Sequence, residues 1–260
     1  GRPPVRVSGL DKAFGAALPT GALPLSVAAA PFALPDRKQA AVAVTVCVRR
    51  PVTDTVVVEK LEVRAAAFDD NYRQRAGQRQ TLQVTLRPNA IGERRVELQS
   101  RLTLPPGRYE VRVAAEAPRG TGGVFLPIEV PDFRKERLSV SGLVLGRSRH
   151  GADDDLADLV PVVPTAARML SPGDPVAAFV RVYQGGRDAL RSIHVRARIL
   201  GASGRPACEE ALELGADQFE PDRAADYRLE LPLTLLGAGQ YLLTVDATDA
   251  KVTARREVRF

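Results

Sequence analysis

The sequence predicts an all-β protein made of two tandem immunoglobulin-like (fibronectin III-like) antiparallel β-sandwiches. Three observations lead to this fold class. Apolar and polar residues alternate with a period of two, which is typical of strands with one buried and one solvated face. Turns rich in glycine and proline separate the strands at near-regular spacing, and no segment has the pattern of a long amphipathic helix. The chain also matches itself at an offset of 132 residues, so one fold occurs twice.

The length of 260 residues fits two modest domains. We predict an N-terminal linker or extension at residues 1–22, a first sandwich at 23–133 and a second sandwich at 134–260. The boundary lies in a short polar connection, residues 131–137, between two apolar stretches. Because this connection is short, we expect the sandwiches to be held semi-rigidly rather than freely tethered.

The internal repeat identifies corresponding strands in the two copies. A repeat this long that occurs in only two copies indicates tandem domains rather than a solenoid, whose units span roughly 20–50 residues. The corresponding segments are 61–65 with 193–197, 107–113 with 239–245, 42–48 with 176–183, and 102–104 with 233–235 after a one-residue slip.

The period of two is clearest in one long segment of each copy. Residues 96–104 alternate from Val96 to Leu104, and residues 227–235 alternate from Tyr227 to Leu235. We therefore expect each segment to be a strand with one buried face. The other expected strands are 42–48, 61–65, 109–113 and 124–130 in the first copy, and 138–145, 176–183, 193–197 and 241–245 in the second.

Each copy carries a Gly-x-Tyr element at the start of a strand, Gly107 with Tyr109 and Gly239 with Tyr241. The glycine ends a turn, and the tyrosine faces the core so that its ring is buried while its hydroxyl reaches a backbone group near the turn. We predict structural roles for these four residues rather than ligand binding.

The distributions of charged and apolar residues argue against two classes of partner. The chain has a net charge of +6, from 37 Lys and Arg against 31 Asp and Glu. The basic residues are spread among apolar and acidic neighbours and form no stripe with stacking aromatic residues, so we expect no nucleic-acid partner. No apolar run approaches the roughly 20 residues of a membrane-spanning helix, so we expect no direct membrane insertion. The sequence begins at Gly1 rather than methionine, and we expect it to be a fragment of a longer protein.

Side chains suited to catalysis at neutral pH are scarce, since the chain has two histidines and two cysteines. His194 is expected on an exposed strand face, and the neighbouring Glu209 and Glu210 point to opposite faces rather than facing each other across a cleft, as glycoside hydrolysis requires. No nucleophile elbow, phosphate-binding loop or zinc-protease motif is present. Residues 69–71 are expected to form a turn rather than a metal site. We expect no enzymatic activity and no cofactor.

One acidic loop is a weak candidate for a metal site. Asp153, Asp154, Asp155 and Asp158 follow His150 closely, and oxygen-rich loops bind Ca²⁺. The spacing lacks the glycine and the distal glutamate of an EF-hand loop. The sequence therefore favours a solvated acidic loop over a weak calcium site.

The two cysteines, Cys47 and Cys208, lie far apart in different copies, and we expect free thiols. Cys47 lies on the face of its strand opposite the valine side chains of residues 42–48. We expect residues 19–35 to cover that face, because they carry apolar side chains that need burial. The thiol would then be inert packing.

Several segments resemble a known group of proteins. They are residues 125–133, 138–145, 226–233 and 239–245, together with 18–25 and Pro31-Phe32. They are similar to the C-terminal region of acidobacterial-type von Willebrand factor A (VWFA)-related domain proteins, without the von Willebrand A domain itself. The resemblance implies a secreted or cell-envelope (periplasmic) location, an upstream von Willebrand A domain as one partner and a further protein partner. The Asp-x-Ser-x-Ser element of the metal-dependent adhesion site is absent, so the resemblance assigns no metal or catalytic residue here.

Two functions follow as hypotheses. The first is a non-enzymatic structural and protein-interaction module that acts as spacer and binding scaffold. The alternative is a carbohydrate-binding β-sandwich module, which would need exposed aromatic side chains on one face. The chain has no tryptophan, and most of its five tyrosines fall in core-facing register, which favours the first hypothesis. Tyr72 and Tyr183 are the candidate aromatic residues for the second.

Overall fold

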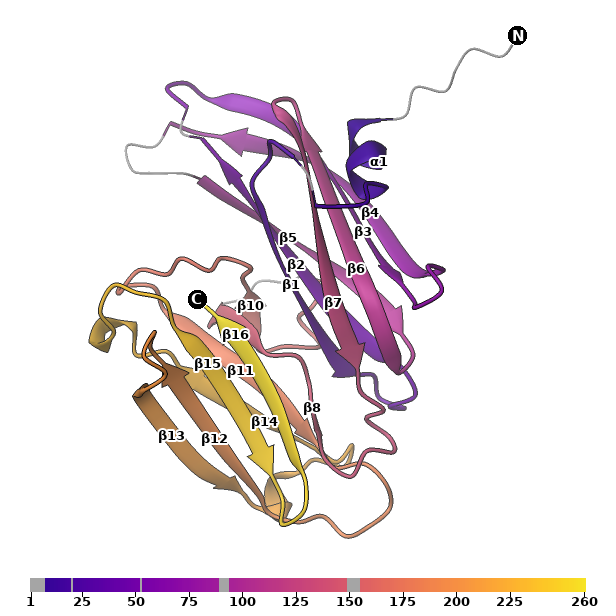
Figure 1. Ribbon diagram of the computed structural model, residues 1–260, viewed down its shortest axis with the longest axis vertical. Helices are drawn as coiled ribbons and strands as arrows, with labels where there is room; N and C mark the ends of the chain where they lie inside the picture. Colours follow the sequence, from indigo (N-terminus) through magenta and orange to yellow (C-terminus); the bar gives the residue numbers. More distant parts are fainter. Residues whose placement is uncertain (1–7, 20, 52, 89–93, 149–154) are drawn as a thin grey trace.

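The computed structural model describes residues 8–19, 21–51, 53–88, 94–148 and 155–260. Within them the chain forms two antiparallel β-sandwiches (Figure 1). The first sandwich packs a three-stranded sheet of order β1-β2-β5 against a four-stranded sheet of order β4-β3-β6-β7. Its strands are β1 (Leu25–Ala33), β2 (Ala40–Arg50), β3 (Val57–Phe68), β4 (Gln74–Leu86), β5 (Arg94–Leu104), β6 (Gly107–Ala117) and β7 (Gly120–Val130).

The second sandwich has a four-stranded sheet of order β13-β12-β15-β16. Its other sheet has the order β10-β9-β11-β14, with the short strand β8 also paired to β11. The elements are β8 (Ser139–Val140), β9 (Val144–Ser148), β10 (Val162–Pro164), β11 (Val176–Tyr183), β12 (Ile193–Leu200), β13 (Pro206–Leu214), β14 (Ala224–Glu230), β15 (Leu242–Thr248) and β16 (Thr253–Arg259), with 3-10 helices η1 (Ala216–Gln218) and η2 (Leu233–Leu235).

The two sandwiches share one strand topology. The order β4-β3-β6-β7 in the first corresponds to β13-β12-β15-β16 in the second, and the neighbours β2-β5 correspond to β11-β14. In an immunoglobulin constant domain the fourth strand belongs to the sheet that contains the first two strands. Here the fourth strand, β4, pairs with the third strand, β3, as in a fibronectin III-like sandwich. The predicted fold class is therefore confirmed.

The alternation of apolar residues produces a separate core in each sandwich. Val42, Val44, Val46 and Val48 of β2 face the first core. Val176, Ala178, Val180 and Val182 of β11 do the same in the second. None of the helices in the described residues is both long and apolar enough to cross a membrane.

Part of the predicted N-terminal linker is packed against the first sandwich. Helix α1 (Gly9–Phe14) begins at Ser8, whose hydroxyl accepts the N–H of Asp11 at 3.1 Å. Leu10 and Phe14 are buried against Ala66 and Ala114 on the outer face of the sheet that contains β3 and β6. Within the predicted linker or extension at residues 1–22, residues 9–14 thus form an extension that packs on the first sandwich, because their apolar side chains cover small residues of the sheet.

The predicted strand at residues 227–235 is shorter than expected. Strand β14 ends at Glu230, and Leu233–Leu235 form a 3-10 helix. Pro232 has no N–H group to donate to a neighbouring strand, so the ladder stops before it. The side chain of Leu235 is 83% exposed, and the proposed match between residues 102–104 and 233–235 does not hold.

Side chains close one side of the first sandwich. Gln78 of β4 accepts the N–H of Arg101 at 3.1 Å, and the Gln80 amide donates to the carbonyl of Gln99 at 2.8 Å. Arg101 and Gln99 belong to β5, so these glutamines join the two sheets. In the described part of the second sandwich, no strand pairs with the outer edge of the corresponding strand, β13.

The connection between the domains is fixed to the second sandwich by an ion pair. Arg137 donates from Nε to Asp249 at 2.6 Å, and the N–H groups of Lys251 and Val252 donate to the same carboxylate at 2.8 and 3.0 Å. The Asp249 side chain is only 5% exposed. The bond from Arg137 and the two backbone bonds lower the pKa of Asp249 from 3.8 to about 2.

This lowered pKa gives the stability of the protein a defined acid dependence. Because the folded pKa lies below the unfolded value, the stabilisation by Asp249 is complete above about pH 4 and is lost as the pH falls towards 2. We expect Asp249→Asn to lower the free energy of unfolding at pH 7 by about 1–2 kcal/mol and to flatten its decline below pH 4. Urea unfolding at several pH values measures both effects. An unchanged acid limb in the variant would contradict the assignment.

Candidate functional site

The two tyrosines of the repeat occupy equivalent corners. Tyr109 donates its hydroxyl proton to the carbonyl of Pro105 at 2.9 Å, and Tyr241 donates to the carbonyl of Gly237 at 2.9 Å. Gly107 has a φ of +152°, a conformation that favours glycine. Gly239 lies against the ring of Tyr241. All four residues lie at turns that end beside a core.

The two corners differ in burial, which predicts different mutational effects. Tyr109 is 7% exposed, whereas Tyr241 is half-buried and its hydroxyl bond is open to water. We expect Tyr109→Phe to destabilise the protein by about 0.5–1.5 kcal/mol, because the carbonyl of Pro105 loses its partner in a shielded position. Tyr241→Phe should cost less, since water replaces its hydroxyl. Thermal unfolding of both variants provides the comparison, and equal losses would contradict it.

The acidic loop is only partly described. Asp153 and Asp154, with His150, lie outside the described residues. Asp155 is exposed, and Asp158 accepts two hydrogen bonds from Nη1 of Arg101 in β5, at 2.9 and 2.8 Å. The residues that the structure describes contain no group of three His, Cys, Asp or Glu side chains that could hold a metal ion. Asp158 is therefore part of a contact between the two sandwiches.

The remaining polar candidates lie apart from one another. Asp69 accepts the N–H groups of Asn71 and Arg73 at 2.9 and 3.0 Å, which confirms a turn at residues 69–71. His194 is 72% exposed beside a glutamate of β13. Glu210 accepts the hydroxyl of Tyr227, whereas Glu209 forms an ion pair with Arg196 on the other face of the sheet.

The two aromatic candidates for sugar binding have opposite environments. Tyr72 is 77% exposed in a turn, with a φ of +56°. Tyr183 is 1% exposed, and its ring packs against Phe133 with the centroids 4.5 Å apart. Its hydroxyl accepts the N–H of Ala33 in β1 at 3.1 Å. The expectation that Tyr183 is exposed is wrong, because the first sandwich covers the end of β11.

Cys47 and Cys208 both carry free thiols. Burial raises the pKa of the Cys47 thiol. The expectation that residues 19–35 cover the face around Cys47 is wrong, because β1 pairs with β2 edge to edge in the same sheet. The second sandwich covers that face instead.

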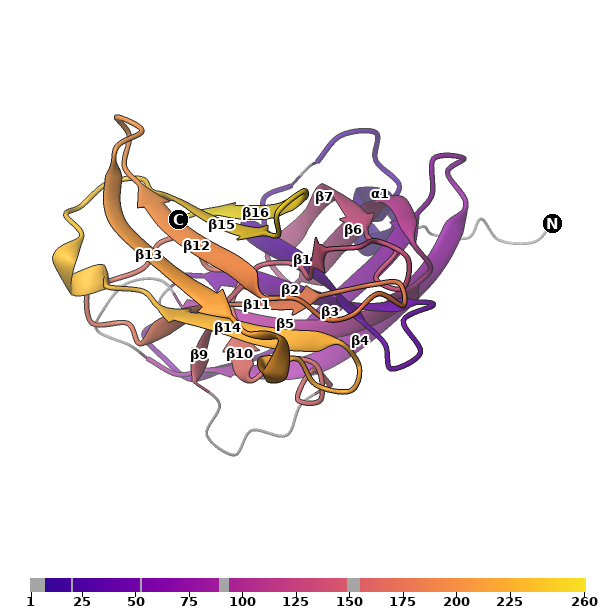
Figure 2. The ribbon, with the colours of Figure 1, turned by 90° about the horizontal axis from the view of Figure 1, so that it is seen from below.

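An apolar interface joins the two sandwiches. Phe32 of β1 stacks on Phe179 of β11 with the ring centroids 6.1 Å apart, and both side chains are at most 1% exposed. Seen from below, β9, β10 and β11 lie beside β2 and β5 (Figure 2). The interface cluster also contains Ala30, Ala41 and Ala43 of the first sandwich, and Val144, Leu156, Leu159, Val160 and Val162 of the second.

Polar contacts surround this interface. Glu97 of β5 accepts the hydroxyl of Thr165 and, at 3.2 Å, the N–H of Ala166. The N–H of Gly142 donates to the carbonyl of Pro31 at 2.8 Å. A Cβ on Gly142 would lie 2.3 Å from the Cα of Ala30, so the two backbones approach too closely for a side chain. Hydrogen bonds therefore fix the interface at several separated points.

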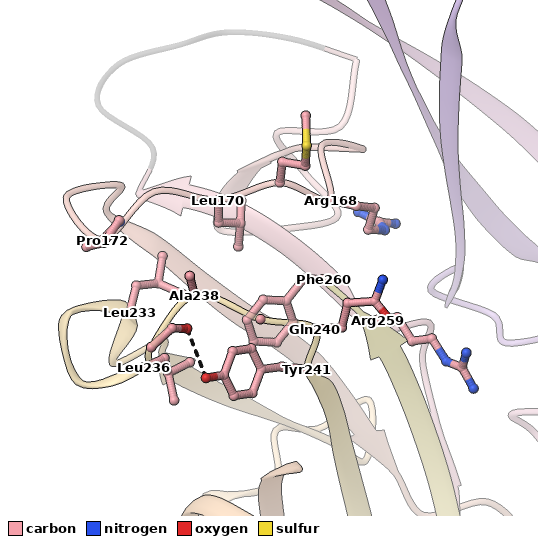
Figure 3. A pocket seen from close by; sticks show the side chains of 13 residues that line it. Arg168, Leu170, Pro172, Leu233, Leu236, Ala238, Gln240, Tyr241, Arg259 and Phe260 are labelled. Atoms are coloured by element: carbon pink, nitrogen blue, oxygen red, sulfur yellow. Dashed lines mark hydrogen bonds between the residues drawn. The ribbon is translucent and has the colours of Figure 1, made fainter. Parts of the chain in front are cut away.

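A pocket of about 870 Å³ lies at one end of the second sandwich (Figure 3). The rings of Tyr241 and Phe260 stack at its wall, with centroids 5.8 Å apart. Arg168 and Arg259 lie on the side of this ring pair that faces the first sandwich. Burial lowers the pKa of the Arg168 guanidinium, which donates to the carbonyls of Thr165 and Ala167. The apolar lining of the pocket includes Met169, Leu170, Pro172, Leu233, Leu236 and Ala238.

Comparisons with known proteins give structural neighbours only. No protein-family model and no curated protein matches the chain. The solved structures that resemble it include the ApaA protein of Bordetella pertussis, with a TM-score of 0.31, 18% identity, and coverage of 43% of this chain and 95% of that one. The FN1–FN3 domains of chicken CNTN1 give a TM-score of 0.25 and 12% identity, with 86% of this chain and 62% of that one covered.

A third neighbour, a Bacteroides fragilis protein whose name describes a beta-galactosidase, gives a TM-score of 0.27 and 9% identity, with 84% of this chain and 32% of that one covered. These values are too low to transfer a function. The comparison therefore leaves the interface as the feature from which a function is argued.

Proposed function

We propose that this chain is a non-catalytic spacer and protein-binding scaffold, in which the two sandwiches act as one rigid unit. The interface around Phe32 and Phe179 carries the proposal, because both rings are removed from water between the two domains. Domains that only share a tether move independently unless their interface is large and apolar. A spacer needs the opposite property, a fixed distance and direction between its ends.

The polar contacts support the same proposal. The carboxylates of Glu97 and Asp158 and the hydroxyl of Tyr183 each bond to a group of the other sandwich. Tyr183 is 1% exposed, so a changed domain angle would leave its buried hydroxyl and the N–H of Ala33 without their hydrogen bond, which is unfavourable. The same change would break the more exposed contacts of Glu97 and Asp158. The secreted or envelope-exposed setting and the upstream von Willebrand A domain, implied by the sequence resemblance, belong to this proposal as the context in which a spacer acts.

Nuclear magnetic relaxation of the ¹⁵N-labelled chain tests the rigid unit. We expect one rotational correlation time for the amides of both sandwiches and a small-angle scattering curve that fits one arrangement. Two correlation times would overturn the spacer. Glu97→Ala removes two contacts across the interface and therefore weakens the coupling that the experiment measures. Glu257→Ala, on the exposed strand β16, is the matched control.

A glycan array tests the alternative in parallel. Of the two aromatic candidates for sugar binding, only Tyr72 is exposed. Saturable glycan binding that is lost in Tyr72→Ala would replace the protein-binding scaffold with a carbohydrate-binding module. Absence of binding, together with one correlation time, is the result expected from the scaffold.

A further inference from the structure

The two copies of the repeat each have an edge strand with no neighbour on its outer side. Strand β4 begins at Gln74 and β13 at Pro206, so their starts are separated by the repeat offset of 132 residues. In the described part of the chain each of them pairs on one side only, β4 with β3 and β13 with β12. The backbone groups on their outer sides are therefore able to pair with a strand of another chain.

The two edges carry opposite charge. Residues 71–88, which contain β4, include four arginines and no acidic residue. Residues 206–222, which contain β13, include six acidic residues and no lysine, arginine or histidine. The second segment is thus strongly acidic in a chain whose net charge is +6. Two strands with the same place in the fold therefore differ in the sign of their charge.

The charged side chains of both edges are accessible to a partner. Arg75 and Arg79 of β4 each pair with a carboxylate of their own chain, yet their side chains are 46% and 50% exposed. Glu209 and Glu213 of β13 lie beside basic side chains of β12 and are 42% and 54% exposed. A guanidinium has five N–H donors and a carboxylate has about four acceptor sites, so each group has the capacity for a second partner.

The spacing of these side chains is the same in the two strands. Arg75 and Arg79 are four residues apart, and so are Glu209 and Glu213. An antiparallel register that places Arg79 opposite Glu209 therefore also brings Arg75 level with Glu213. Opposite charges that face each other across neighbouring strands stabilise their pairing.

The same register matches side chains on the other face of the two strands. Gln78 lies opposite Glu210, so an amide meets a carboxylate that can accept its N–H groups. Ala76 lies opposite Leu212, so two apolar side chains meet. A parallel register would exchange these partners and place Leu212 opposite Gln78. Antiparallel pairing is also slightly more stable per residue, which favours the antiparallel register.

Charge also determines which edges meet. Two β13 strands would bring glutamates against glutamates, and two β4 strands would bring arginines against arginines, which is destabilising. Of the three pairings, only β4 with β13 brings opposite charges together. Figures 1 and 2 show β4 and β13 on opposite sides of the molecule, so they pair between two copies rather than within one chain.

We propose that this chain assembles head to tail with further copies of itself, through antiparallel pairing of β4 in one copy with β13 in the next. The joined sheet has the strand order β7-β6-β3-β4-β13-β12-β15-β16. Because the two contacting surfaces differ, each added copy offers a new free edge, and the contact produces an open chain or a ring. This inference goes beyond the proposed scaffold function and adds a second copy of the chain as a partner.

Sedimentation velocity of the full chain over a concentration series tests the assembly. We expect the average mass to rise from monomer through dimer to larger species, with a Kd of about 0.01–1 mM, as for a small interface. Arg79→Glu and Glu209→Arg should each weaken association at least about tenfold, because each places like charges opposite each other. Arg108→Glu, at a 76% exposed position of β6 inside the same sheet, should leave association unchanged.

An equimolar mixture of Arg79→Glu and Glu209→Arg is the decisive comparison. The altered β4 edge of one variant meets the altered β13 edge of the other with opposite charges again, and the two remaining edges are unaltered. We expect the mixture to associate within about threefold of the unaltered chain. Recovery requires both variants to be folded, so it excludes misfolding as the cause of the single losses. Arg75→Glu with Glu213→Arg repeats the test if one of the first two variants fails to fold.

Three results would overturn the proposal. They are a monomer at every concentration up to about 1 mM, association that both single variants retain, and a loss in folded variants that the mixture does not reverse. Assembly is measured as mass, whereas domain rigidity is measured by relaxation of the dilute chain. Failure of this inference is therefore distinguishable from failure of the scaffold.

Discussion

Replacing Phe179 by alanine is expected to destabilise the protein by about 3–5 kcal/mol, the range for fully buried phenylalanines. The ring packs on Phe32 between the two sandwiches, and its removal leaves a cavity that the rigid strands around it cannot fill. Because Phe179 faces the first sandwich rather than its own core, the loss should fall on the coupling of the domains. We therefore expect two separate transitions in guanidinium unfolding where the unaltered chain shows one.

The control for this variant is an exposed leucine. Leu235→Ala should change the free energy of unfolding by less than about 0.5 kcal/mol, as is usual for surface positions. Calorimetry distinguishes a loss of coupling from a loss within one domain. If Phe179→Ala lowered the stability of the second sandwich alone and left a single transition, the interface would not couple the domains.

A second large effect is expected at a buried ion pair in the first sandwich. Arg50, at the end of β2, donates from Nη2 to Glu59 of β3 at 2.5 Å, and the side chains are 3% and 6% exposed. Glu59→Ala would leave the guanidinium charge without its partner in an apolar environment. We expect a loss of about 3–5 kcal/mol, measured by urea unfolding.

The double variant Arg50→Met/Glu59→Leu distinguishes the effect of an unpaired buried charge from the effect of altered packing at these two positions. Apolar residues of similar volume often replace a buried ion pair without loss, because no charge is then desolvated. We expect the double variant to unfold within about 1 kcal/mol of the unaltered chain. A loss equal to that of Glu59→Ala would show that packing, rather than the unpaired charge, causes the effect.

The repeat and the alternation predicted the fold because both depend on local patterns. Strands β3 and β12 and the two tyrosine corners were found from residues close in sequence. The interface was missed although β2 contained a signal. Residues 40–48 form an almost unbroken apolar run, which is typical of a strand covered on both faces. The covering residues, such as Phe179, are too distant in sequence for a periodic pattern to identify them.

The candidate sites were also predicted where they depend on residues close in sequence and missed where their partners are distant in sequence. The turn at residues 69–71 followed from the local preference of Asp and Asn to bond to their own backbone. Tyr183 was misjudged because its partners, Phe133 and Ala33, belong to other elements. The pocket at Tyr241 and Phe260 could not be predicted, since Arg168 and Leu170 reach it from a loop without a counterpart in the repeat.

The glutamines of β4 imply that two sheet edges, those of β5 and β13, differ in how they resist aggregation. Gln78 and Gln80 occupy backbone groups of β5 that another chain could otherwise engage, and ionic strength has little effect on such bonds. The outer edge of β13 is protected by charge instead, through Glu209, Glu210 and Glu213. Raising the salt from 0.1 M to 1 M shortens the range of that repulsion from about 10 Å to about 3 Å. A high salt concentration should therefore promote strand exchange between chains at the outer edge of β13, and should have little effect at β5.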